Sequence, residues 1–420
     1  MKLLFLYIII MACFGCDSTK NTKISPTYIN EMEVINIDPK KATTFNFSEA
    51  FSRIEFVELE TSEECLIGEI NRIIIHNNRI IILDEMSESV YTFDMNGHYM
   101  YKISAQGNGP QEYSSISSEM FIDTINNHLI LPANDVMYFD LEDGSFVKRE
   151  KDFLRSENAF VAPGTFAYFL YFANWYEYKE NLLIVDNNKV SKYMPIPQYM
   201  EGVSVIREDM AVFNAYNNER SLYFIEPFND TIYRILPNTL KAVKYVDFGN
   251  HKVTPSVLSR YAENDDLKSI MLNPNSDYCS SINHFFETDI FYYFSYNYKS
   301  SGYTYFYNKI KNEAIHSKAY FDDLAFTWSI CDYLFAGESY LVSYIESQEF
   351  ESIKERNNSY LEDLKLFAAE NNIPKEEMAP LTNKFELYKK NYADIINRLA
   401  QKDENDNPVL IFCHVNTTHK

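Results

Sequence analysis

Short apolar runs recur along most of the chain, and turns rich in Asn, Asp, Gly or Ser separate them. Residues 80–84 and 90–94 form one pair of runs, and residues 129–131 and 136–140 form the next. Each run is rich in β-branched and aromatic residues, which favour strands over helices. The pattern therefore predicts antiparallel meanders. Four later copies are read at residues 182–186, 222–235, 291–307 and 340–344.

The spacing of the copies indicates a repeat architecture. Phe93 and Phe139 hold equivalent places in the first two copies and lie 139 − 93 = 46 residues apart. This period is typical of one four-stranded propeller blade. Six copies predict an all-β fold, a six-bladed β-propeller.

The C-terminal part of the repeat region is interrupted. Residues 351–404 are helical in pattern, with Phe385, Tyr388, Ile395 and Leu399 on one helical stripe that we expect to pack against the propeller. The run 409–415 follows and is interpreted as a strand that returns to close the ring. A ring has no free strand edges when one terminus of the chain completes the blade that the other terminus began. A shorter helix is predicted to begin at Thr254 and Pro255.

The N-terminus reads as an export signal. Lys2 precedes the apolar run 3–11, which is too short to span a bilayer, and Gly15 stands directly before Cys16. This arrangement resembles the lipobox of bacterial lipoproteins, which implies lipidation of Cys16 and an anchor in the cell envelope. A plain signal peptide is the alternative. The predicted organisation is a signal peptide at 1–15, a lipid-anchored tether at 16–27, the propeller at 28–350, a helical insertion at 351–404 and the closing strand at 405–420.

Three short motifs carry a resemblance to a known family. Residues 106–113 read Gln-Gly-Asn-Gly-Pro-Gln-Glu-Tyr, residues 229–233 read Asn-Asp-Thr-Ile-Tyr, and residues 406–410 read Asp-Asn-Pro-Val-Leu. The chain resembles the six-bladed β-propeller lipoproteins of Bacteroidetes over most of its length. The resemblance implies the fold and an exported lipoprotein of the outer membrane, periplasmic or surface-facing. It implies little chemistry, because members largely lack an assigned activity.

The glycine motif is interpreted as a structural turn between blades. Pro110 removes an amide and strands are expected on both sides, so the motif does not suit a phosphate loop. Gly107 and Gly109 are expected to take backbone conformations that other residues resist. Tyr113 is expected to pack between blades, and the alternative is that Glu112 and Tyr113 reach a ligand.

Charge and cysteine content narrow the function classes. The 38 Lys and Arg residues face 60 Asp and Glu residues, and the net charge of −22 argues against nucleic acid as a partner. Cys-x-x-Cys and zincin motifs are lacking, so no metal site or cofactor is predicted. A divalent ion bound in the channel is kept as an alternative. Cys65, Cys279, Cys331 and Cys413 are interpreted as buried thiols, with Cys331–Cys413 as the disulfide to test first.

An aromatic segment provides the main functional hint. Tyr168, Tyr171, Phe172, Trp175, Tyr176 and Tyr178 lie within eleven residues. Most of these rings are expected to fill the space between blades, while Trp175 and Tyr176 are candidate ligand contacts, because sugar C–H faces stack on aromatic rings.

Three function hypotheses follow. The first is a lipid-anchored binding module of the envelope, with carbohydrate as the leading ligand. The second is a glycan or lactone hydrolase or lyase centred on the channel, which requires convergent Asp, Glu or His. The third is a structural subunit that docks onto an envelope protein.

Overall fold

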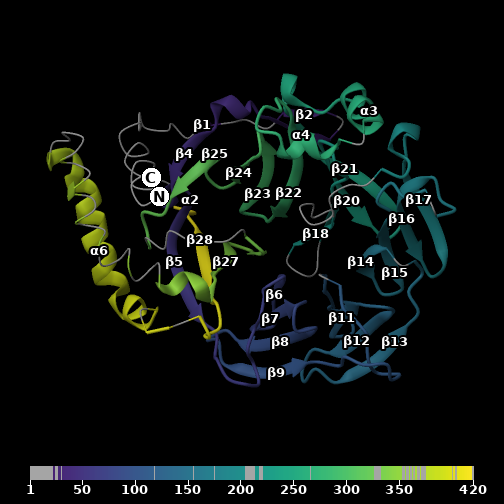
Figure 1. Ribbon diagram of the computed structural model, residues 1–420, viewed down its shortest axis with the longest axis horizontal. Helices are drawn as coiled ribbons and strands as arrows, with labels where there is room; N and C mark the ends of the chain where they lie inside the picture. The colour runs from purple at the N-terminus through teal and green to yellow at the C-terminus, as the bar shows by residue number, and fades with distance from the viewer. Residues whose placement is uncertain are drawn as a thin grey trace.

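The computed structural model describes residues 22–418 with gaps, and its strands form a ring of six sheets (Figure 1). The gaps are residues 24–26, 30, 118, 155, 175, 204–212, 217–220, 265, 326–332, most of 352–374, 400 and 403. Each sheet is a four-stranded antiparallel meander, and two sheets carry extra strands at the outer edge. The prediction of a six-bladed β-propeller is confirmed.

Blades 1 to 3 each come from one continuous stretch of chain. Blade 1 is built from β6 (Arg72–His76), β7 (Arg79–Asp84), β8 (Ser89–Asp94) and β9 (Tyr99–Ile103). Blade 2 is built from β10 (Phe121–Asp123), β11 (His128–Pro132), β12 (Val136–Asp140) and β13 (Phe146–Glu150). Blade 3 is built from β14 (Glu157–Ala162), β15 (Thr165–Phe169), β16 (Glu180–Asp186) and β17 (Lys189–Pro195).

Blades 4 to 6 also use strands from the N-terminal part of the chain. Blade 4 contains β18 (Phe213–Tyr216), β19 (Ser221–Phe224), β20 (Thr231–Leu236) and β21 (Thr239–Asp247), followed by β3 (Met32–Asn36) and β2 (Thr27–Ile29). Blade 5 contains β22 (Cys279–Glu287), β23 (Phe291–Tyr298), β24 (Ser301–Asn308) and β25 (Glu313–Phe321), with β4 (Thr43–Asn46) and β1 (Thr22–Lys23). Blade 6 contains β26 (Phe335–Gly337), β27 (Tyr340–Ile345), β28 (Val409–Val415) and β5 (Phe51–Glu58).

The first strand of each blade lines the ring axis, and first strands of different blades contact one another, as β6 contacts β26 and β18 contacts β22. The two middle strands are sandwiched between neighbouring blades. In β7 all residues after Arg79 are buried, whereas in the outer strand β13 every residue after Phe146 is exposed. The continuous apolar runs of the sequence are therefore the middle strands, which are buried on both faces.

The ring closes where the two ends of the chain pair. Strand β28 pairs antiparallel with β5, from Val409 opposite Glu58 to Val415 opposite Phe51. The predicted returning strand is thus the third strand of blade 6, and the N-terminal strand β5 completes that blade at its outer edge. Just before β28, the buried Asn407 donates from Nδ2 to the carbonyl oxygens of Glu60 and Cys65, both at 2.6 Å, and its Oδ1 accepts from the amide of Ile67 at 2.8 Å.

Before it reaches blade 6, the N-terminal segment runs along the outside of two other blades. Strand β3 adds parallel to β21, and β4 adds parallel to β25. Segments far apart in sequence therefore lie side by side at the rim of the ring (Figure 1). The sequence analysis did not anticipate this belt of strands.

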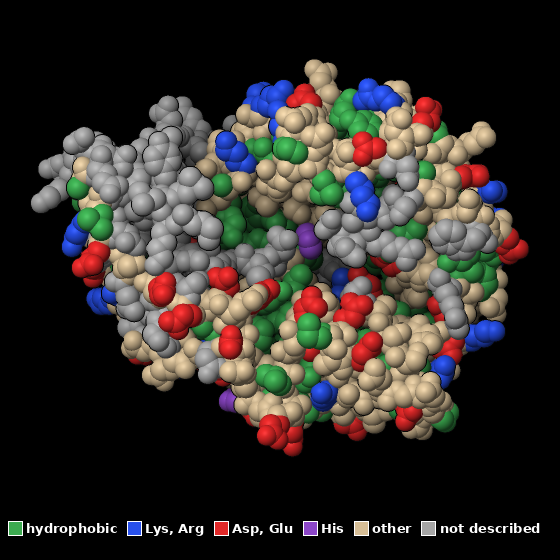
Figure 2. All heavy atoms as spheres, in the orientation of Figure 1, with side chains coloured by type: hydrophobic (Ala, Val, Ile, Leu, Met, Phe, Trp, Pro, Cys, Tyr) green, Lys and Arg blue, Asp and Glu red, His purple; other side chains and the backbone are tan. Residues whose placement is uncertain are grey.

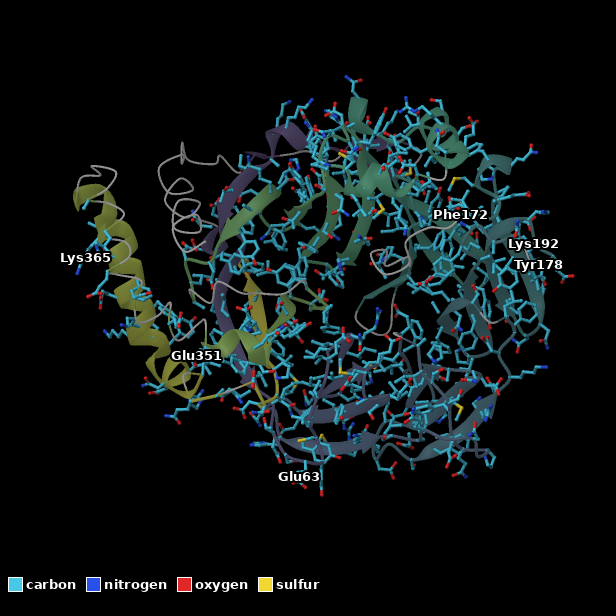
Figure 3. The ribbon with its side chains drawn as sticks, viewed as in Figure 1. Glu63, Phe172, Tyr178, Lys192, Glu351 and Lys365 are labelled. Atoms are coloured by element: carbon cyan, nitrogen blue, oxygen red, sulfur yellow. The ribbon has the colours of Figure 1, made fainter. Side chains whose placement is uncertain are left out.

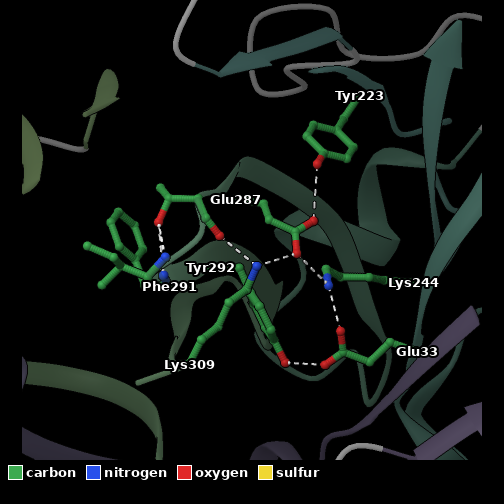
Figure 4. Close-up of polar contacts among 9 residues, drawn as sticks. Glu33, Tyr223, Lys244, Glu287, Phe291, Tyr292 and Lys309 are labelled. Atoms are coloured by element: carbon green, nitrogen blue, oxygen red, sulfur yellow. Dashed lines mark hydrogen bonds and ion pairs between the residues drawn. The ribbon is translucent and has the colours of Figure 1, made fainter. Parts of the chain in front are cut away.

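A buried charge network fastens the belt to blades 4 and 5 (Figure 4). Lys244 of β21 pairs with Glu33 of β3 at 2.6 Å and with Glu287 of blade 5 at 2.9 Å. Tyr292 donates to Glu33 at 2.8 Å, and Lys309 pairs with Glu287 at 2.9 Å. Burial alone would lower the pKa of Lys244, but the two carboxylates outweigh it and raise that pKa, so the lysine stays charged.

The helices lie outside the ring of strands. Helix α3 (Pro255–Glu263) begins as predicted, with Thr254 as its N-cap, and the short α4 (Lys268–Leu272) follows. Helix α6 (Lys375–Leu399) comes between β27 and β28 in the sequence, and it lies at one side of the ring (Figure 1). Its buried Phe385, Tyr388, Ile395 and Leu399 join the core of blades 5 and 6, which confirms the predicted stripe.

A single turn, α2 (Phe47–Ala50), precedes β5, and 3-10 turns occur at Pro39–Lys41, Gln198–Met200, Gly249–His251 and Ser347–Glu349.

Three of the four cysteines after the tether are described. Cys65, Cys279 and Cys413 are buried free thiols, which confirms that interpretation for them. Cys331 lies outside the described residues. Because Cys413 is a free thiol, the suggested Cys331–Cys413 disulfide is wrong, and Cys413 instead packs in the core of blade 6.

The Asn407 contacts make ring closure testable. We predict that Asn407→Ala lowers the free energy of unfolding by about 3 kcal/mol or more, because the amide of Ile67 and the carbonyls of Glu60 and Cys65 lose their buried partner. Urea unfolding measures the effect. The exposed Asn250→Ala is the control and should change stability by less than about 0.5 kcal/mol. Equal stability of the two variants would contradict this account of closure.

Candidate functional site

The cavity at the centre of the ring is lined mostly by apolar residues, and polar atoms contribute as much of its surface as apolar ones. It encloses about 220 Å³ and is lined by residues such as Ile73, Phe121, Phe160 and Phe335 from the first strands of four blades. Arg72 and Asp123 are its charged lining residues among those described. The described lining of this cavity contains one carboxylate and no histidine, and the cavity includes no residue of β18 or β22. Within the described part of the chain, no group of three His, Cys, Asp or Glu side chains is placed to hold a metal ion.

A larger cleft of about 440 Å³ lies between blades 2 and 3. Its lining comes from the β9–β10, β11–β12, β13–β14 and β15–β16 connections and from the start of β14. These connections lie on one face of the ring, because consecutive strands of each meander alternate in direction. In the face shown in Figure 2, acidic side chains gather beside the central hollow. The lining residues of the cleft are Ser115, Ile116, Ser117, Glu119, Pro132, Ala133, Asn134, Asp152, Ser156, Glu157, Asn158, Leu170, Tyr171 and Tyr176.

Asn158 gives the cleft an unsatisfied acceptor. Its side chain belongs to the second residue of β14 and is only 5% exposed. The amide nitrogen makes a long contact of 3.5 Å to the carbonyl oxygen of Ser156, and Oδ1 has no hydrogen-bond partner in the described structure. A buried acceptor without a partner costs stability, on the order of 1–3 kcal/mol. A group that lines a cleft and carries this cost is a candidate ligand contact.

Burial raises the pKa of two carboxyl groups in the cleft. Glu119 pairs with Arg72 of β6 at 2.9 Å, and burial raises its pKa against the effect of that arginine. Asp152 accepts a hydrogen bond from the hydroxyl of Tyr168 at 2.8 Å. Burial raises the pKa of Asp152 to about 6, although this hydrogen bond works in the opposite direction. The cleft therefore contains a carboxyl group that titrates just below neutral pH.

The aromatic segment supplies one wall of the cleft. Tyr168 is buried beneath it, whereas Tyr171 and Tyr176 line it. Tyr178 lies away from the cleft, with the Lys192 ammonium 5.0 Å from its ring centre, and Figure 3 places both near Phe172 on the blade 3 side of the ring. Trp175 lies outside the described residues, so its contact with ligand stays a prediction.

The backbone of this wall is strained. Tyr171 and Phe172 both have positive φ, at 52° and 56°, a region that bulky residues rarely enter. Asn181, fully buried, accepts from the amide of Phe172 at 2.8 Å, and the amide of Gly202 donates to the Phe172 carbonyl at 2.7 Å. These bonds hold the strained turn in place. Such strain is concentrated at functional sites and supports the assignment of this wall.

The glycine motif lies between blades 1 and 2 and does not line the cleft. Tyr113 is 2% exposed, packs in the core shared by those blades and donates to the Glu88 carbonyl at 2.8 Å. The Glu112 carboxylate accepts from the amide of Gly109 at 2.7 Å.

The expectation that Gly107 and Gly109 take backbone conformations that other residues resist is wrong, since neither has a positive φ. The two glycines instead leave room for the Glu112 carboxylate, an exposed side chain that a larger residue would displace. A Cβ at Gly107 would lie 2.0 Å from Glu112 Oε2, and one at Gly109 would lie 3.0 Å from the same oxygen. Pro110 opens the tight turn that brings Glu112 back against both glycines.

Sequence reasoning located one wall of this site and missed the rest. Tyr176 was a candidate, but Glu119, Asp152, Asn158 and Tyr171 were not. Glu119, Asp152 and Tyr171 come from three different connections and Asn158 comes from β14, so they share no local spacing and the sequence carries no signal that would group them.

The fold places the protein among the six-bladed β-propellers, and comparison with known proteins defines its family. Residues 32–414 match the model of a domain of unknown function, DUF4934, and the chain belongs to that family. A solved structure from Bacteroides fragilis, described as a "putative exported protein", has a TM-score of 0.68 at 16% identity, covering 91% of this chain and 99% of that one. A DUF4221 family member from Bacteroides vulgatus has a TM-score of 0.45 at 12% identity, covering 87% and 98%. No curated protein matches the sequence.

Asp152 gives the site a measurable pH dependence. Its pKa of about 6 in the folded protein lies above the ordinary value of 3.8, so the folded state holds this proton more tightly than the unfolded state. The resulting stability is present below about pH 4 and is lost as the pH rises through 6. We predict that Asp152→Asn changes the melting temperature little at pH 4 and raises it progressively up to pH 7.5.

Asp143→Asn is the control for this series of thermal unfolding measurements. Hydrogen bonds from Ser145 lower the pKa of Asp143, so its replacement should give no gain in melting temperature near neutral pH. A melting-temperature difference between Asp152→Asn and the wild type that does not vary with pH would contradict the assignment.

Proposed function

We propose that this protein is a carbohydrate-binding module whose site is the cleft between blades 2 and 3. The observation that carries the proposal is the buried Asn158 Oδ1, which lines the cleft and has no partner in the described structure. A ligand hydroxyl that donates to this oxygen would relieve the cost of leaving it unpaired.

The rest of the lining supports a ligand rich in hydroxyl groups. Ser115, Ser117 and Asn134 place hydroxyl and amide groups along the cleft, and Asp152 adds a carboxyl group. Tyr171 and Tyr176 provide aromatic faces against which the C–H face of a pyranose ring can stack. Aromatic surface together with a few placed polar groups is the usual composition of a small-ligand site. Trp175 is proposed as a further contact because it directly precedes Tyr176.

We also propose that the protein is exported and anchored to the envelope through a lipid on Cys16. The apolar run 3–11 followed by Gly15 and Cys16 supports this, as does the description of the Bacteroides fragilis structure. No helix in the described part of the chain is long and apolar enough to cross a membrane.

Asn158→Leu separates a binding role from a structural one. Leucine fills a similar volume but cannot accept a hydrogen bond, so we predict that the variant loses at least about tenfold in affinity for the strongest ligand of a glycan array. Its melting temperature without ligand should stay unchanged or rise, because an unpaired buried acceptor has been removed. Calorimetric titration and thermal unfolding measure the two quantities.

Tyr178→Ala is the matched control, since Tyr178 belongs to the same aromatic segment but does not line the cleft. It should bind like the wild type. Wild-type affinity in Asn158→Leu, or no glycan bound by the wild-type protein, would contradict the proposed function.

The anchor has its own test. We predict that Cys16→Ser moves the protein, expressed in its native host or a Bacteroides strain, from the membrane fraction to the aqueous fraction, since the lipid-bearing thiol is lost. Cys13→Ser, three residues earlier in the same segment, is the control and should remain with the membrane. Both variants in the same fraction would rule out the anchor at Cys16.

A further inference from the structure

A second cleft, of about 350 Å³, lies between blades 3 and 4. Its lining comes from the β15–β16, β17–β18, β19–β20 and β21–β22 connections and from the outer strand β21. Connections between the second and third strands of a blade, and connections from one blade to the next, lie on the same face of the ring. The cleft between blades 3 and 4 is therefore on the same face as the cleft between blades 2 and 3.

The two clefts are similar in chemistry. The lining of the cleft between blades 3 and 4 includes the aromatic Phe172, Phe228 and Tyr245 and the polar Asn229, Asp230 and Thr254. Aromatic surface with a few polar groups is also the composition of the proposed site. Phe228 has a φ of 63°, so both clefts contain a bulky residue in strained backbone.

The β15–β16 connection is a wall that the two clefts share. Tyr171 lines the cleft between blades 2 and 3, and the next residue, Phe172, lines the cleft between blades 3 and 4. Asn181 accepts from the amide of Phe172 at 2.8 Å and donates from Nδ2 to the Glu226 carboxylate of blade 4 at 2.9 Å. These bonds join the shared wall to blade 4, so the two clefts have a defined position relative to each other.

Asp230 gives the cleft between blades 3 and 4 a polar group that the fold does not use. Its half-buried carboxyl group makes no hydrogen bond to another described residue. Burial raises the pKa of Asp230 to about 7; the Lys252 ammonium works against this shift and the Asp247 carboxylate adds to it. Near neutral pH the group therefore exists in both protonation states, and it can accept a hydrogen bond from a ligand hydroxyl or donate one to it.

We infer that the two clefts bind one ligand together, and that this ligand is a linear glycan of several sugar units that crosses the Tyr171–Phe172 turn. This inference rests on the proposed function. One blade separates the clefts, and packed sheets lie about 10 Å apart, so a single pyranose ring cannot occupy both. A glycan that reaches both clefts gains affinity, because its second contact is made within an existing complex.

Oligosaccharides of increasing length test this inference. The probes are four series of two to six units: β-1,4-linked glucose, xylose and N-acetylglucosamine, and α-1,4-linked glucose. Calorimetric titration measures their affinity for the wild-type protein. In a series that binds, we expect the hexasaccharide to bind at least about tenfold more tightly than the disaccharide, with one hexasaccharide per protein. If an array identifies a different glycan, its own two-unit and six-unit fragments serve as the probes.

Variants of each cleft show where the gain with length arises. Asp230→Ala should reduce the advantage of the hexasaccharide to about threefold or less and leave the affinity for the disaccharide unchanged. Asn158→Leu should weaken the binding of both. Asp247→Asn is the control, since Asp247 does not line the cleft and asparagine keeps an oxygen for the Gly249 amide. It should bind like the wild type. Thermal unfolding of each variant verifies that it is folded.

The outcomes separate this inference from the proposed function. Equal affinity for the disaccharide and the hexasaccharide would overturn the shared ligand and leave carbohydrate binding intact. An advantage of the hexasaccharide that survives in Asp230→Ala would also overturn it, because the longer ligand would then gain its contacts outside the cleft between blades 3 and 4. Failure of all four series to bind, together with failure across a wider glycan array, would overturn both.

Discussion

Closure of the ring is the constraint on which the rest of this structure depends. A blade cannot bury both faces of its middle strands by itself, so each blade requires a neighbour on either side. Here the last blade is completed by pairing between β28 and β5, strands from opposite ends of the chain. Asn407 joins the segment before β28 to the segment after β5 through buried hydrogen bonds. The position of every blade, and of every junction between blades, follows from this closure.

The belt of N-terminal strands covers further strand edges, at the rim of the ring. β3 and β4 cover the outer edges of blades 4 and 5, where unpaired strand edges would otherwise be exposed. The buried Lys244, paired with Glu33 and Glu287, gives this contact a defined register, because separating any partner would leave a charge buried without compensation. The belt is confined to blades 4 and 5 and does not cover the junction of blades 2 and 3.

Much of the fold could be predicted from the sequence, because the middle strands of a propeller are buried on both faces. Runs such as 80–83 and 136–139 are apolar throughout for this reason, and their period revealed the blade. The belt could not be predicted, since β3 and β4 pair with strands some 200 or more residues away and only the closed ring brings them together. The site was harder still. Asp152 looks like an ordinary loop residue and Asn158 like an ordinary residue near a strand start, until blade packing places them in one cleft.

The most direct test of the proposed site is a crystal structure of the protein grown with the glycan that binds it most tightly in an array. The account predicts a pyranose ring in the cleft between blades 2 and 3, stacked on Tyr171 or Tyr176, with a hydroxyl group donating to Asn158 Oδ1. A sugar bound in the central channel or on the rim, with this cleft filled by solvent alone, would contradict the account.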